Sequence, residues 1–94
     1  MSSVIFEKNG ASFATPIPDE FILKYLPSAS GSYVKVYLYM FYHYFNAVSD
    51  FTLAQAADAL GITEADVTEA LFYWQKKGLL SLQRTEDACR IRFF

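Results

Sequence analysis

The chain has few residues of the kinds that usually carry chemistry. Its 94 residues include one cysteine, one histidine and one tryptophan. A lone cysteine, Cys89, excludes an internal disulfide framework and leaves a zinc site without a second thiolate. The sole histidine, His43, has no carboxylate at helical spacing, and the sequence contains neither a phosphate-binding glycine loop nor a nucleophile motif. We therefore expect no enzyme, no cofactor, no metal and no small-molecule substrate.

Charge and long apolar runs are also scarce. Charged residues make up 19% of the chain and the net charge is -2, so any binding to nucleic acid requires a local patch. The most apolar long stretch, "YVKVYLYMFYHYF", is interrupted by Lys35 and His43 and is too short to cross a bilayer. The opening "MSSVIFEKNG" lacks the basic start of a signal peptide. These features predict a cytoplasmic protein with no membrane partner.

Apolar side chains are abundant instead. Hydrophobic residues account for 53% of the chain and aromatic residues for 18%. This is more apolar surface than one small domain of this length usually needs. The composition predicts a single core with hydrophobic surface left over.

The first thirty residues form an N-terminal extension in this interpretation. "SVIFE" has the character of a short strand, and "PDEFILKYLP" predicts a two-turn helix that begins near Pro18 and stops at Pro27. The run "YVKVYLYMFYHYFN" then predicts a helix of roughly four turns.

The remainder, 31–94, predicts a winged-helix domain. Thr52 and Gln55 form a capping-box pattern, and Gly61 ends a helix at about 53–60. Thr63 caps a second helix at about 64–77, which closes at Gly78. The alternating runs "LLSLQR" and "CRIRFF" predict a wing hairpin at about 79–94, with its inward side chains at Leu80, Leu82, Ile91 and Phe93. The fold class is therefore mostly α with a small β-hairpin (α+β): a winged helix-turn-helix with an N-terminal strand and helix extension.

The second helix of this helix-turn-helix is poorly suited to DNA. Its inward positions are expected to be Val67, Ala70, Leu71 and Trp74, which turns Ala65, Glu69, Phe72 and Lys76 outward. A base-reading helix favours Arg, Lys, Asn or Gln at such positions. The acids of its first turn suit helix capping, and they also disfavour phosphate. For Phe72 two interpretations stay open: burial against the extension or the wing, or an aromatic anchor at a protein interface.

The long helix is apolar nearly all round. If its core face consists of Val34, Leu38, Phe41 and Phe45, the opposite side carries Lys35, Val36, Tyr39, Tyr42, His43 and Asn46, with Tyr33, Met40 and Tyr44 between the two sides. Such a helix is covered on more than one side. The cover is either the N-terminal extension alone or a second copy of the chain that meets the tyrosine-rich face.

Two segments resemble a known family. "TPIPDEFILKYLPSASGSYVKVYLYMFYHY" and "FTLAQAADALGITEADVTEALFYWQKKGLLSL" are similar to the N-terminal domain of DnaD-like proteins, primosome components that initiate DNA replication in Gram-positive bacteria and their phages. The resemblance covers about residues 15–82, and its more specific part is the Gly-x-Tyr-Val-x-Val-Tyr-Leu run. It implies an extension that drives self-association and a separate C-terminal DNA-binding domain in the full protein.

The predicted function is an N-terminal oligomerisation and protein-interaction module of a DnaD-like replication initiation protein. Its partners are then other copies, as a dimer or tetramer, and other primosome proteins. The predicted interface residues are Ile5, Phe6, Tyr39, Tyr42, Phe72 and Tyr73. The alternative is a DNA-binding winged-helix transcriptional regulator that uses its recognition helix and basic wing. Its candidate DNA contacts are Lys76, Lys77, Arg84, Arg90 and Arg92, which otherwise belong to an ordinary solvated hairpin and helix end.

Overall fold

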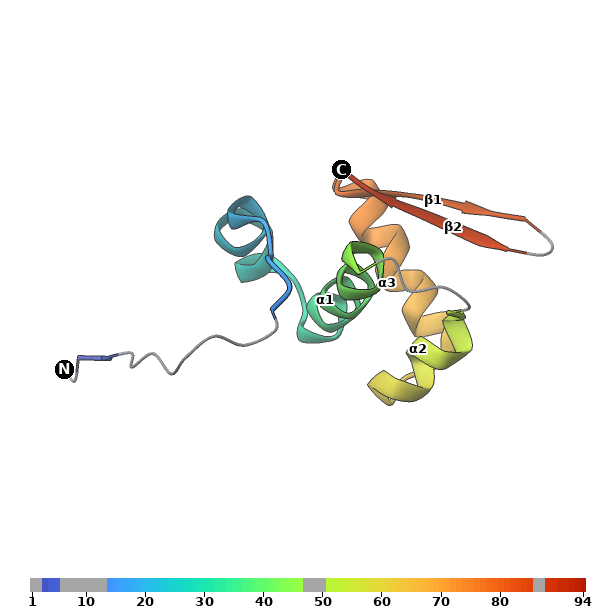
Figure 1. Ribbon diagram of the computed structural model, residues 1–94, viewed down its shortest axis with the longest axis horizontal. Coiled ribbons are helices and arrows are strands. Elements are labelled where there is room, and N and C mark those ends of the chain that lie inside the picture. The colour runs from blue at the N-terminus through green and yellow to red at the C-terminus, as the bar shows by residue number, and fades with distance from the viewer. Residues whose placement is uncertain (1–2, 6–13, 47–50, 86–87) are drawn as a thin grey trace.

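A computed structural model describes residues 3–5, 14–46, 51–85 and 88–94 of the chain. In chain order its elements are η1 (Phe21–Tyr25), η2 (Leu26–Ser28), α1 (Gly31–Phe45), α2 (Leu53–Leu60), α3 (Glu64–Lys76), β1 (Leu80–Arg84) and β2 (Cys89–Phe93). The three long helices gather around one core, and the antiparallel hairpin packs on α3 while its strands extend beyond the helices (Figure 1). The predicted fold class, mostly helical with a small hairpin, is confirmed.

Local hydrogen bonds fix the two helices of the helix-turn-helix. The Thr52 hydroxyl accepts the Gln55 N–H at 3.1 Å, and the Gln55 side chain accepts the Thr52 N–H at 2.9 Å. A second capping box joins Thr63 and Asp66 at 3.0 and 3.1 Å. Between the helices Gly61 adopts a left-handed φ of 70°, which a side chain disfavours. The predicted caps and stop of these helices are confirmed.

The inward face of α3 is also as predicted. Trp74 is fully buried, and its indole N–H donates to the Tyr33 carbonyl at 2.8 Å, so α1 and α3 are joined by a hydrogen bond inside the core. Val67, Ala70 and Leu71 are buried beside it. A buried tryptophan with a satisfied N–H keeps its apolar gain without a desolvation penalty.

The hairpin presents one face to this core. Leu80, Leu82 and Phe93 are buried, and Ile91 is half-buried, as predicted. Leu80 pairs with Phe93 and Leu82 with Ile91 across the strands. In addition, the Leu82 N–H donates to the Gln75 side chain at 2.6 Å, which fastens β1 to α3. The orientation of the hairpin relative to the helices is therefore fixed by packing and by a hydrogen bond.

The predicted core face of α1 is wrong in part. The buried residues of α1 are Val36, Tyr37, Met40 and Phe41, whereas Leu38 and Phe45 are exposed and Val34 is only half-buried. The helix is rotated so that Tyr37 lies between Phe21, Trp74 and Phe93. The Tyr37 ring fills this space well. Hydrophobicity alone did not predict that Tyr37, rather than the neighbouring Leu38, would be buried.

The segment before α1 packs against the same core. The chain is helical from Asp19, and Phe21 is buried with its ring stacked on Tyr37 at a centroid distance of 3.8 Å. The turn continues one residue beyond Pro27, to Ser28, because proline is tolerated near the start of a helical turn. Residues 3–5 belong to no strand, and the rest of the predicted strand, Phe6 included, lies outside the described residues.

Candidate interaction surfaces

The outward face of α3 forms one wall of a groove. Ala65, Glu69, Phe72 and Lys76 are exposed, as predicted for this face. The groove has a volume of about 570 Å³, and its lining comprises Leu53, Glu64, Ala65, Thr68, Glu69, Phe72 and Arg84. Phe72 remains 49% exposed, so neither the described part of the extension nor the wing buries it. The groove combines an aromatic side chain with two carboxylates, Glu64 and Glu69, and one arginine, Arg84.

One of these carboxylates is held in place by α1. The Tyr33 hydroxyl donates to the Glu69 side chain at 2.9 Å. This hydrogen bond to a negatively charged acceptor raises the pKa of Tyr33. The ring of Tyr33 also packs on Tyr73 at a centroid distance of 4.7 Å. The α1–α3 contact thus presents an acidic side chain where a recognition helix would meet phosphate.

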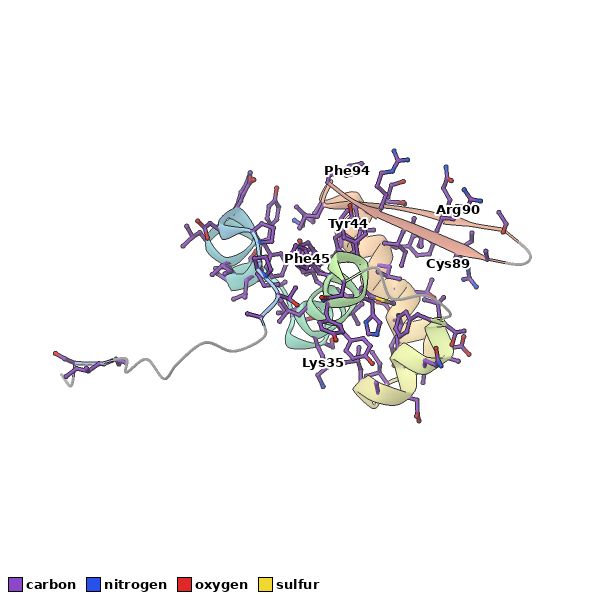
Figure 2. All side chains as sticks on the ribbon, in the orientation of Figure 1. Lys35, Tyr44, Phe45, Cys89, Arg90 and Phe94 are labelled. Carbon is purple, nitrogen blue, oxygen red and sulfur yellow. The ribbon has the colours of Figure 1, made fainter. Side chains whose placement is uncertain are left out.

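A second candidate surface runs along α1. Leu38, Tyr42 and Phe45 lie at i, i+4 and i+7, which places them on one side of the helix, and we call them the α1 stripe. Leu38 is 37% exposed, and Tyr42 and Phe45 are about half exposed. In Figure 2, Phe45 lies on the side of α1 nearest the N-terminal helical segment. That segment leaves Ile22 and Leu23 exposed as well.

The six predicted interface residues fall in different environments. Tyr42 and Phe72 are half exposed on α1 and α3, and Ile5 is 83% exposed. Tyr39 is half-buried against His43 and Phe51, and Tyr73 is half-buried against Tyr33. Phe6 lies outside the described residues. The structure therefore does not gather the five described residues into one patch.

The five basic residues are divided between three places. Lys76 and Lys77 end α3, and the Lys77 ammonium lies 5.5 Å from the centre of the Tyr73 ring. Arg84 lines the α3 groove. Arg90 and Arg92 lie on the opposite, outer face of the hairpin, where they line a hollow of about 420 Å³ with Ser81, Gln83 and Ile91. The wing therefore does not add a continuous basic surface to the recognition helix.

His43 and Cys89, which are of the residue types most often found in catalytic and metal sites, pack against neighbouring residues. His43 stacks on Phe51 at a centroid distance of 3.8 Å, and its Nδ1 lies 2.9 Å from the Tyr39 carbonyl. Cys89 is half-buried in β2, and burial raises the pKa of its thiol although nearby Arg84 acts in the opposite direction. In the described ranges no three His, Cys, Asp or Glu side chains come together as metal ligands.

Sequence reasoning missed four residues of these surfaces. Leu38 and Phe45 were assigned to the core, and no local signal distinguishes them on an apolar helix. Ser81 and Gln83 could have been found, because the turn "TEDA" places them opposite Arg92 and Arg90 in the hairpin.

None of the helices that the structure describes has the length and apolar character needed to span a bilayer.

Comparison of the chain with protein-family models, with curated proteins and with solved structures finds no match.

Proposed function

We propose that the chain is an oligomerisation and protein-interaction module. The observation that carries the proposal is the α1 stripe: three large side chains, Leu38, Tyr42 and Phe45, lie in an exposed row beside the buried face of α1. Exposed hydrophobic side chains are common singly, but a row of them on one helix is typical of a contact between proteins. A second copy is the simplest partner, since a two-fold axis brings the same stripe of both chains together.

The α3 groove supports a second contact of the same module. Phe72 and Leu53 supply apolar surface, and Glu64 and Glu69 add negative charge at its edge. This combination suits a segment of another protein that carries an apolar anchor and a basic residue.

The sequence resemblance indicates the process in which this module would act. Because residues 15–82 resemble the N-terminal domain of DnaD-like proteins, we propose that it assembles replication initiation complexes in the cytoplasm. Association would hold several DNA-binding domains near one another, so that weak individual affinities add through effective concentration. The acids on the outward face of α3 favour this function over that of a transcriptional regulator.

Sedimentation equilibrium across a concentration series tests the proposal. The wild-type chain should show a mass that rises with concentration, and the double variant Leu38→Ser with Phe45→Ser should remain monomeric. The variant Phe72→Ser is the matched control on α3 and should associate like the wild type. A wild-type chain that stays monomeric at about 100 µM, well above the dissociation constants of standard-size interfaces, would refute self-association.

A further inference from the structure

The outer face of the hairpin is a polar surface with a fixed geometry. Its residues are those that alternate with the buried Leu80, Leu82 and Phe93. Ser81 pairs with Arg92 and Gln83 with Arg90, and paired side chains lie about 5 Å apart at their β-carbons. Two guanidinium groups, a hydroxyl and an amide therefore share one side of the hairpin, around the hollow of about 420 Å³.

The positive charge of this face is not neutralised by its described surroundings. Across the ranges that the structure describes, the ion pair found is Lys24 with Glu20, so no described carboxylate lies within ion-pair distance of Arg90 or Arg92. The acids of α3 lie on the other side of the hairpin, with Arg84. Figure 2 shows Arg90 projecting from the hairpin on the side opposite Cys89.

An aromatic side chain continues the row. The Phe94 N–H donates to the Leu79 carbonyl at 3.0 Å, so the ladder extends past β2 and the strand alternation places Phe94 on the side of Arg92. Phe94 is 75% exposed and lies at the end of the hairpin (Figure 2). With the spacing of an extended chain, Arg90, Arg92 and Phe94 follow one another at steps of about 6.8 Å, the first two in β2 and the third directly after it.

We infer that the outer face of the hairpin binds single-stranded nucleic acid, independently of α3. Arg90 and Arg92 each bind a backbone phosphate through the planar fork of the guanidinium, assisted by Ser81 and Gln83. Phe94 offers its ring to an unpaired base, which a duplex cannot present. The site goes beyond the proposed assembly function, because it uses a surface that neither the α1 stripe nor the α3 groove includes.

Fluorescence anisotropy with a labelled oligothymidylate of about 16 nucleotides tests this site. The double variant Arg90→Ala with Arg92→Ala should weaken binding by about tenfold or more at low salt. It should also reduce the slope of log affinity against log salt by about 1.4, since each phosphate contact on a single strand contributes about 0.7. Phe94→Ala should weaken binding about fivefold without changing the salt slope.

Two controls decide between this face and the alternatives. Arg84→Ala removes a positive charge from the inner face of the same hairpin and should leave the affinity unchanged. Arg90→Lys with Arg92→Lys keeps the charge and should retain most of the salt slope. Equal affinity of the wild type and the double alanine variant, an equal loss in Arg84→Ala, or tighter binding of a duplex of the same length would each overturn the inference.

Discussion

Removal of the Phe21 side chain tests whether the segment before α1 belongs to the cooperative core. Phe21 is 1% exposed, stacks on Tyr37 with an interplanar angle of 9°, and lies 5.3 Å from the Trp74 ring. Truncation of a buried phenylalanine to alanine costs about 3–5 kcal/mol, and the loss of the stacked contacts favours the upper part of that range. Against a total of about 5–15 kcal/mol for a domain, Phe21→Ala should remove a large share of the stability.

Urea denaturation followed by the fluorescence of Trp74 measures this loss. With an m-value of about 2 kcal/mol/M, a cost of about 4 kcal/mol lowers the midpoint by about 2 M. Leu23→Ala is the matched control, because Leu23 lies on the same helical turn, is 77% exposed and should change the stability by no more than about 0.5 kcal/mol. A loss below about 1 kcal/mol in Phe21→Ala would refute the reasoning and would show that residues 31–94 fold without the segment.

Two further predictions concern the helix-turn-helix. Gly61→Ala should destabilise the fold by about 1–2 kcal/mol, and Gly61→Asn should destabilise it by less. A new β-carbon at this position meets no atom within 4 Å, so the cost comes from the left-handed backbone alone. Equal stability of the alanine variant and the wild type in thermal melts would contradict this account. Asp66 accepts hydrogen bonds from Thr63, and these lower the pKa of its carboxyl. The stability it contributes is therefore present above the ordinary pKa of about 3.9 and is lost as the pH falls through the lower folded-state pKa. Asp66→Asn should be less stable than the wild type near neutral pH, and urea midpoints should converge as the pH falls through that window; a difference that is constant with pH would argue against the cap.

The sequence alone was sufficient where a local interaction fixes the structure. The capping boxes at Thr52 and Thr63 and the left-handed Gly61 involve residues at most three positions apart, so their signals are complete within short windows. The buried face of α3 was also predictable, because its apolar residues are separated from polar ones around the helix. The same holds for the hairpin, in which strand alternation sets Leu80 and Leu82 against Ser81 and Gln83.

Only the tertiary structure decided how α1 is oriented and which surfaces remain exposed. A helix that is apolar on nearly every side can bury any of several faces, and periodicity does not choose between them. Packing selects the buried face: the Tyr37 ring lies against Phe21, Trp74 and Phe93, whereas Leu38 stays exposed. Strand alternation places Arg84 on one face of the hairpin and Arg90 and Arg92 on the other. Because the helices pack on only one of these faces, the tertiary structure decides that Arg84 lines the α3 groove and that Arg90 and Arg92 line the outer hollow. Local hydrogen bonds and alternation thus determined the elements, whereas packing determined which side chains are left for partners.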